Sequence, residues 1–188
     1  MELFVDTCNG NLVILLIEDN KVIDQILLKN QNRISDIYQD NLDDILKRNN
    51  TTLKEIKAIY LTKGPGSYTG VRIGLTMAKT LFCIDDSIKI WTISSLQFQA
   101  GLGKVVSKLD ARSQKWYFGV YQDGKPIIED QILPIDTANQ IESGFEDFKI
   151  VVDQVGVDYQ KNFLDLKIFF QLVKKSDKLN PNYIKNFI

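Results

Sequence analysis

Residues 63–75 of this chain read Lys-Gly-Pro-Gly-Ser-Tyr-Thr-Gly-Val-Arg-Ile-Gly-Leu. The stretch places glycines, a proline, a serine and a threonine between an apolar strand at 56–62 and an apolar helix at 71–84. Backbone N–H groups and hydroxyls at such a junction point beyond the helix N-terminus, where they can bind a phosphate, another anion or the backbone of a partner. The stretch therefore predicts an α/β fold with a functional strand-to-helix loop.

The loop departs from the two common phosphate-binding patterns. A Walker A loop ends in Gly-Lys-Ser/Thr before its helix, but Lys63 precedes this loop. A Rossmann turn needs G-x-G-x-x-G, and the glycine spacing here is different. Two interpretations stay open: an anion or nucleotide site, and a tight turn that caps the helix. Both involve the same residues: Gly64, Gly66, Ser67, Thr69, Gly70 and Arg72.

Composition limits the classes of function. The 188 residues include 23 Lys and Arg against 24 Asp and Glu, which argues against strong non-specific binding of nucleic acid. The sequence has no histidine, which excludes Ser-His-Asp and Cys-His catalysis and histidine metal sites. Cys8 and Cys83 form no disulfide framework. The N-terminus does not resemble a signal peptide and no apolar run is long enough to span a bilayer, so we expect a cytoplasmic protein.

Hydrophobic patterns predict the same order of elements twice. The first half has strands at 3–6, 12–17, 22–28, 56–62 and 88–93, with helices at 35–47, 71–84 and 94–100. The second half has strands at 105–109, 116–121, 127–133 and 148–152, a weak helix at 137–142 and a helix at 159–174. We therefore predict two α/β lobes, each opening with a three-stranded meander. The predicted ranges are 1–101 and 102–188, and the second lobe is reduced.

The two halves also align without a gap where each one begins. The identical pairs are Asp6 with Asp110, Asp19 with Asp123, Lys21 with Lys125, and Ile23 with Ile127. Matching turns and strand lengths favour an internal duplication over two unrelated meanders.

Asp6 and Asp110 each end a first strand just before a turn. In a two-lobed fold the carboxylates could face each other across a cleft, where such a pair can hold Mg²⁺ and phosphate or activate a water. The alternative is that each carboxylate caps its own turn by accepting from backbone N–H groups. The spacing of the two residues favours the second interpretation.

The helix at 71–84 is apolar nearly all round, with Arg72 and Lys79 as its charged residues. Such a helix is buried on both sides. Its own sheet can cover one side, and either the helix at 35–47 or another protein must cover the other. We favour a protein interface over a purely internal helix. The candidate interface residues are Ile34, Ile37, Tyr38, Val71, Ile73, Gly74, Leu75, Met77, Ala78, Leu81 and Phe82.

The string GPGSYTGVRIGLTMAKTL, residues 64–81, closely resembles the signature of the TsaB (YeaZ) family. Asp6-Thr7, the segments 93–96 and 109–112, and the closing Pro-Asn-Tyr-Ile-Lys at 181–185 match further landmarks in order. The family is similar in fold to the actin/Hsp70/sugar-kinase (RNase H-like) group. The resemblance thus implies two lobes, each a mixed sheet in β-β-β-α-β order.

The resemblance also implies a function. TsaB-like proteins are non-catalytic partners of TsaD, which transfers a threonylcarbamoyl group to adenosine beside the anticodon of tRNAs reading codons that begin with A. The implied contact is made by the N-terminal lobes, here through the helices at 35–47 and 71–82. The ATPase TsaE joins the assembly. The chain itself is expected to need no metal or cofactor, with ATP and Mg²⁺ only in the complex, to meet tRNA only through the complex, and to form a homodimer when alone.

One position departs from the family pattern. Many members carry a histidine where this chain has Ile34, which argues against acid–base or metal chemistry there. The alternative function is a small ATP-binding enzyme of the actin/sugar-kinase type that uses Asp6 and Asp110. It would need a glycine-rich adenosine motif in the second lobe, where Gly144 and Gly156 are isolated. A protease is disfavoured because Ser67 or Cys83 would have no evident base.

Overall fold

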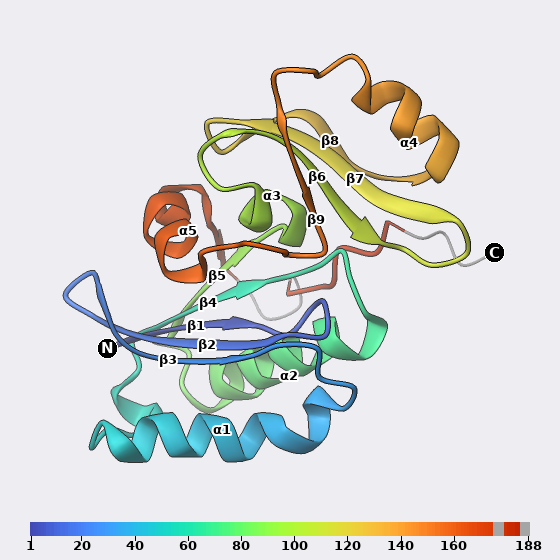
Figure 1. The fold of residues 1–188 in the computed structure, drawn as a ribbon. Helices are drawn as coiled ribbons and strands as arrows, with labels where there is room; N and C mark the ends of the chain where they lie inside the picture. Colours follow the sequence, from blue (N-terminus) through green and yellow to red (C-terminus); the bar gives the residue numbers. More distant parts are fainter. Residues whose placement is uncertain (175–178, 185–188) are drawn as a thin grey trace.

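The first sheet is built outward from its central strand. In the computed structural model, which describes residues 1–174 and 179–184, β1 (Glu2–Asp6) pairs antiparallel with β2 (Leu12–Glu18) and parallel with β4 (Ala58–Thr62). β3 (Lys21–Leu28) lies beyond β2, while β5 (Lys89–Ile93) and β10 (Gln171–Val173) lie beyond β4. The strand order is therefore β10-β5-β4-β1-β2-β3, a mixed sheet (Figure 1).

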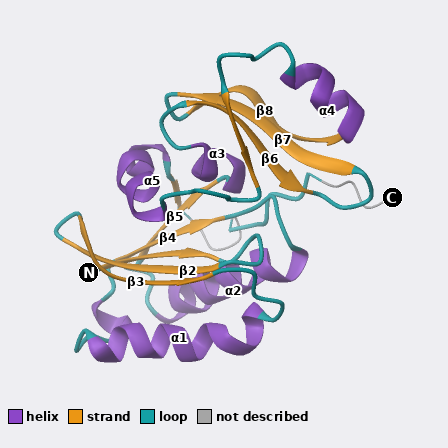
Figure 2. Ribbon diagram, viewed as in Figure 1, coloured by secondary structure: helices purple, strands orange, loops and turns teal. Residues whose placement is uncertain are grey.

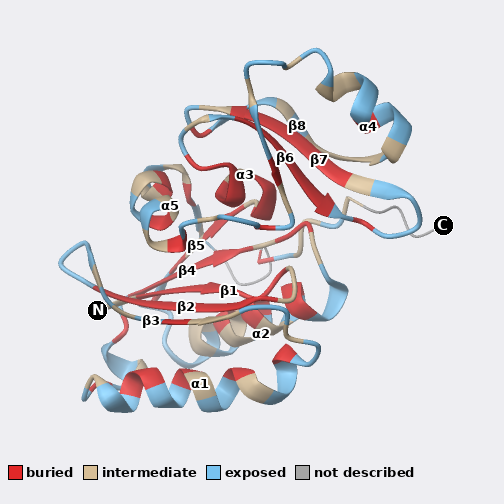
Figure 3. Cartoon of the chain, viewed as in Figure 1, coloured by how far each residue is buried: buried red, intermediate tan, exposed pale blue. Residues whose placement is uncertain are grey.

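Helices cover both faces of this sheet, which explains the unbroken apolar run in β2. Alternate side chains of a strand point to opposite faces. Leu12, Ile14 and Leu16 accordingly pack in the core beneath α1 (Ile34–Arg48) and α2 (Tyr68–Ile84). Val13, Leu15 and Ile17 pack with α3 (Ser95–Ala100) and α5 (Tyr159–Leu166) on the other face. Figure 3 shows the resulting buried strands between partly buried helices.

The second lobe repeats this plan on a smaller scale. Its sheet has the order β8-β7-β6-β9, formed by β6 (Lys104–Asp110), β7 (Lys115–Gln122), β8 (Lys125–Pro134) and β9 (Lys149–Val152). β6 pairs antiparallel with β7 and parallel with β9, as β1 does with β2 and β4. α4 (Ile135–Glu142) lies on its outer face (Figure 2). The predicted β-β-β-α-β order is confirmed in both lobes.

The short helix α3 joins the two lobes. Its Leu96 and Ala100 pack with the second lobe, whereas Phe98 stacks on Phe4 of the first lobe with ring centroids 4.7 Å apart. Gln99, between them, is buried and donates from Nε2 to Ser107 Oγ at 2.7 Å. At α3 the contact between lobes thus combines apolar packing with a buried polar group whose hydrogen bonds are satisfied.

The helix predicted at 159–174 is wrong in its second half. α5 ends at Leu166, a 3₁₀ turn follows at Lys167–Phe169, and β10 then pairs antiparallel with β5. Phe170 turns inward at this point and makes edge contacts with Phe4 and Tyr60, which a continued helix would prevent. β10 therefore returns the chain to the first sheet, while the division at residue 101 remains a prediction. Of the closing segment at 181–185, Lys185 lies outside the described residues.

No helix in residues 1–174 or 179–184 is both long and apolar enough to cross a bilayer.

Candidate functional site: the cleft and the partner face of α1 and α2

The glycine-rich loop packs directly on the turn after β1. The Ser67 N–H donates to the Cys8 carbonyl at 2.7 Å, and Thr7 Oγ1 donates to the Gly70 carbonyl at 2.7 Å. A Cβ added at Gly66 would overlap the Cys8 carbonyl oxygen, and one at Gly70 would overlap that of Thr7. These positions therefore need glycine because two backbone segments touch there.

Ser67 is the N-cap of α2. Its Oγ accepts from the Gly70 N–H at 3.2 Å, the geometry expected of a capping serine. The Ser67 and Gly70 N–H groups, two of the donors that an anion site would use, thus have partners inside the chain. The arrangement supports a tight turn that fixes the start of α2, and Thr69 remains on the cleft wall.

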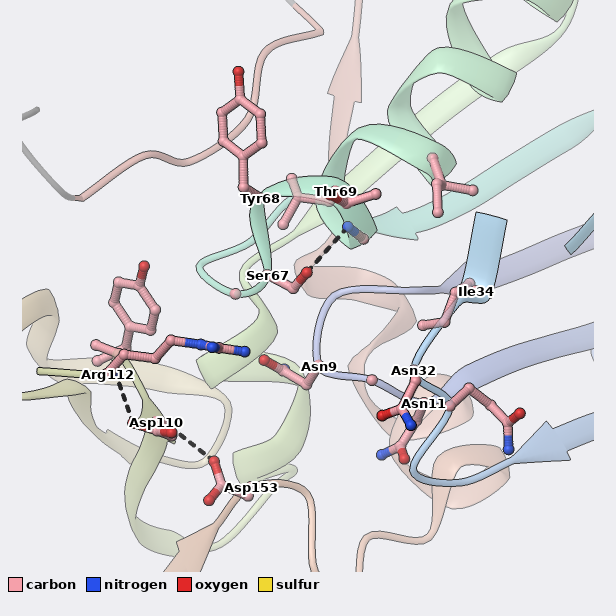
Figure 4. A pocket seen from close by; sticks show the side chains of 18 of the residues that line it. Asn9, Asn11, Asn32, Ile34, Ser67, Tyr68, Thr69, Asp110, Arg112 and Asp153 are labelled. Atoms are coloured by element: carbon pink, nitrogen blue, oxygen red, sulfur yellow. Dashed lines mark hydrogen bonds between the residues drawn. The ribbon is translucent and has the colours of Figure 1, made fainter. Parts of the chain in front are cut away.

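A cleft of about 830 Å³ opens between this loop and the second lobe (Figure 4). It is walled by the turn after β1, the segment leading into α1, the start of α2, and the turn between β6 and β7. The lining is rich in carboxamides and has charges of both signs. These polar residues are Asn9, Asn11, Asn30, Gln31, Asn32, Asn182, Arg33, Arg112, Asp110 and Asp153.

Arg112 enters the cleft from a strained turn. Arg112, Ser113 and Gln114 have φ values of 60°, 54° and 59°, a left-handed run that costs about 1–2 kcal/mol per residue. Asp110 Oδ1 accepts from the Arg112 N–H at 2.7 Å, and Asp153 Oδ1 accepts from the Asp110 N–H at 2.8 Å. In Figure 4 the Arg112 side chain points toward Asn9 on the opposite wall. Asp110 thus caps its own turn, the interpretation favoured from sequence.

Asp6 lies inside the protein and does not line the cleft. It is 1 % exposed, and its carboxylate accepts from the Cys8 N–H at 2.9 Å, Thr62 Oγ1 at 2.7 Å and Gln154 Nε2 at 2.7 Å. Burial raises the pKa of Asp6, although these three donors oppose the shift. The carboxylate thus joins the lobes through Gln154. The pairing of Asp6 with Asp110 across the cleft, the less favoured of the two interpretations, is not formed.

The candidate interface residues divide into two groups. Ile34, Tyr38, Val71, Gly74, Leu75 and Ala78 are buried in the lobe's own core. Ile37, Ile73, Met77, Leu81 and Phe82 are half-buried and pack against the edge of that core. We call Ile73, Met77 and Leu81 the apolar row of α2. Ile84 lies beyond the row and is 76 % exposed. The helix is therefore less enclosed than its composition predicted, and apolar surface remains available along it.

Several cleft residues were not found from the sequence. Nothing in the sequence marks Asn9 or Asn11 as functional, and Arg112 stands out only as part of the landmark at 109–112. Nothing in the sequence marks Gln154 as a functional residue. Its bonds to Asp6 and Asn11 form only because a turn of the second lobe lies next to the end of β1. Arg72, assigned to the loop, does not line the cleft itself but donates from Nε to the hydroxyl of Tyr183, which does, at 2.8 Å.

The described residues contain no cluster of three or more Cys, Asp or Glu side chains that could hold a metal ion.

Comparisons with known proteins identify the family. A family model described as "TsaD: tRNA N6-adenosine threonylcarbamoyltransferase" matches residues 30–143, more than half of the chain. The tRNA threonylcarbamoyladenosine biosynthesis protein TsaB of Bacillus subtilis is 35% identical over 70% of this chain and 59% of its own length. The chain belongs to the TsaB (YeaZ) branch of this family.

Two further matches extend over nearly the whole chain. The uncharacterized protein MG208 homolog of Mycoplasma pneumoniae is 27% identical over 98% of this chain and 95% of its own length. YeaZ from Pseudomonas aeruginosa superposes with a TM-score of 0.76 at 18% identity, covering 97% of this chain and 100% of that structure. The TsaB (YeaZ) resemblance is thus confirmed, as is the two-lobed α/β fold.

Proposed function

We propose that this chain is a non-catalytic subunit for the synthesis of threonylcarbamoyladenosine in tRNA and that it binds and supports a TsaD homologue. In the family, relatives named TsaB are tRNA threonylcarbamoyladenosine biosynthesis proteins. Several features of this chain support a subunit without chemistry of its own. Asp6 is enclosed and bonded to three donors, and the sequence has no histidine to act as a base.

The apolar row of α2 is the observation from which we infer the surface that binds the partner. Ile73, Met77 and Leu81 recur at a spacing of four residues, so they lie on one side of the helix. All three are half-buried and pack against the core. Ile37 of α1 is half-buried against the same core, and α1 and α2 lie on the same face of the sheet (Figure 1). A two-helix face with a half-buried apolar row suits packing against a similar pair of helices.

Membership of the TsaB (YeaZ) family implies which other components the assembly contains. TsaE joins the complex, ATP and Mg²⁺ act only there, and this chain meets tRNA only through the complex. Without a TsaD homologue, the same face pairs with a second copy of the chain, since a two-fold axis can bring identical apolar rows together.

The test is co-purification with a TsaD homologue after Met77→Glu. Met77 is only half-buried in the isolated chain, so a carboxylate there can reach water, whereas a partner would bury it at a cost of several kcal/mol. We expect at least about a tenfold loss of affinity, equivalent to about 1.4 kcal/mol.

The matched control is Thr76→Glu. Thr76 is exposed on the same helix and lies about 100° away around its axis. This variant should keep wild-type affinity. Equal binding by wild type and Met77→Glu, with unchanged unfolding curves, refutes the assigned face. Ala78 is unsuited to this test because it is fully buried, so a large residue there disrupts folding first.

A further inference from the structure

The last described residues, 179–184, cross from one lobe to the other at the cleft. Leu179 is 1 % exposed and belongs to the core beneath α1 and α2. Ile184 packs against the core of the second lobe. Asn182 and Tyr183, between these two anchors, line the cleft. In Figure 1 the red end of the chain accordingly runs between the lobes.

Asn182 makes a hydrogen bond to each lobe. Its backbone N–H donates to the Lys63 carbonyl at 2.7 Å, immediately before the glycine-rich loop. Its side-chain Nδ2 donates to Asp130 Oδ2 on β8 at 3.2 Å. Asp130 also accepts from Ser94 Oγ, at the N-cap of α3, and from the Tyr121 hydroxyl. The single residue Asn182 thus bridges the loop of the first lobe and a half-buried carboxylate of the second.

Tyr183 fixes the first turn of α2 from outside. Its hydroxyl accepts from Arg72 Nε at 2.8 Å, and its ring stacks on that of Tyr68 with centroids 5.8 Å apart. The Arg72 guanidinium lies 3.9 Å from the centre of the Tyr68 ring. Such a cation–π and hydrogen-bonded cluster stabilises the arrangement of its members, although water weakens it at an exposed site. The segment therefore holds both the loop and the helix that follows it.

We propose that residues 179–184 form a strap that sets the separation of the two lobes at the cleft and holds the first turn of α2. The strap is anchored by apolar residues at its two ends, whereas its middle makes hydrogen bonds and ring stacking through half-buried and exposed side chains. Its middle can therefore detach without unfolding either core. Any event that displaces Tyr183 from Arg72 also loosens the Asn182 bridge, so the cleft and the start of α2 change together.

The experiment compares two shortened chains with the full chain. One chain ends after Pro181 and so lacks the Asn182 and Tyr183 contacts and the Ile184 anchor. The matched control ends after Ile184 and keeps them all. Hydrogen exchange is followed in peptides covering 66–76, which include the start of α2, and 12–28, which cover β2 and β3. The strap predicts about tenfold faster exchange at 66–76 in the shorter chain only, with exchange at 12–28 unchanged.

A distance measurement between the lobes checks the second half of the proposal. Spin labels are placed at Asp36→Cys and Glu146→Cys, exposed positions in the first and second lobes, in a Cys83→Ser background. Cys8 stays unlabelled because it is buried, which raises the pKa of its thiol to about 12. The strap predicts a broader distribution of distances in the chain that ends after Pro181 and the full-chain distribution in the control.

The point variants Asn182→Ala and Tyr183→Phe separate the two halves of the strap. Asn182→Ala removes the bond to Asp130 and should broaden the distances between labels. Tyr183→Phe keeps the stacked ring and loses only the acceptor for Arg72, so it should act mainly on exchange at 66–76. Unchanged exchange and distances in the chain ending after Pro181 overturn the proposal. Faster exchange throughout 12–28 also overturns it, because the segment is then an ordinary part of the core.

Discussion

The contact between the glycine-rich loop and the turn after β1 makes a strong prediction about two glycines of α2. Gly70 lies where a Cβ would overlap the Thr7 carbonyl oxygen, a backbone atom held within the loop contact. Gly74 lies one turn further along, where a Cβ would be 3.3 Å from Thr7 Oγ1, the end of a side chain. The two sites share a helix and a neighbour but differ in what the added methyl group meets.

The expected effect follows from opposing contributions. Replacing a helical glycine by alanine stabilises the helix by up to about 1 kcal/mol. At Gly70 the overlap forces the loop away from β1, at a cost of about 1–3 kcal/mol for overpacking. It also breaks the bond from Thr7 Oγ1 to the Gly70 carbonyl, worth about 1 kcal/mol. Gly70→Ala should therefore lower the free energy of unfolding by about 1–3 kcal/mol, whereas Gly74→Ala should change it by less than about 1 kcal/mol.

Urea unfolding followed by circular dichroism measures both variants. The midpoint should fall clearly for Gly70→Ala and stay near the wild-type value for Gly74→Ala, with the same slope in each case. A midpoint for Gly70→Ala at or above that of wild type refutes the reasoning. The close approach of loop and turn would then not be what requires glycine at this position.

Three further predictions address charge, assembly and packing. Arg48 donates to both Asp24 oxygens at 2.6 and 2.7 Å, which lowers the pKa of Asp24 to about 2, below its ordinary 3.8. The ion pair therefore stabilises the folded chain above about pH 4, and this stabilisation is lost as the pH falls through 2. Asp24→Asn should lower the free energy of unfolding by about 1 kcal/mol at pH 7 and by little at pH 2. An equal loss at both pH values contradicts this. In sedimentation velocity the wild-type chain alone should show a dimer that Met77→Glu converts to monomer, while Thr76→Glu stays dimeric; an equally dimeric Met77→Glu argues against this face. Phe163→Ala, at the centre of the aromatic cluster with Phe4 and Tyr60, should destabilise the chain by about 3–5 kcal/mol in urea unfolding, and a loss under 1 kcal/mol would show that α5 is not a firm part of the core.

The elements with regular patterns were predictable from sequence. β2 reads as a continuous apolar run because both of its faces are covered, and α1 shows its buried residues at helical spacing. The cap of α3 at Ser94 is a favoured capping residue type, whereas α2 starts at Tyr68, before the predicted start at 71. These features are local, so a short window of sequence contains the information that determines them.

The end of the chain was harder to predict because its structure depends on distant partners. Residues 159–174 have apolar positions compatible with one helix, yet Phe170 is drawn into a cluster formed by Phe4, Tyr60 and Phe163. The edge of β5 then offers unpaired backbone groups, and β10 pairs with them. The hydrophobic pattern of residues 159–174 does not reveal that β5, about 80 residues earlier in the chain, has an edge free to pair.

The site was predicted in part for the same reason. The loop residues were found because glycine and serine mark turns, but the rest of the cleft lining consists largely of amide and charged side chains that are common on any surface. The bond from Gln154 to Asp6 joins residues 148 positions apart. Only the packing of the two lobes reveals that Asp6 is enclosed and that Arg112 reaches the cleft.

The return of β10 to the first sheet also determines when that lobe can be completed during synthesis. A ribosome releases the chain from the N-terminus, so β1 to β5 and their covering helices α1 and α2 emerge first. The opposite face of the same sheet is closed by Phe163 and Phe170, which come after the whole second lobe. The apolar side chains of Phe4, Val13 and Leu15 therefore stay without their final cover until about residue 173 has emerged. The first lobe to begin folding is thus also the last to finish.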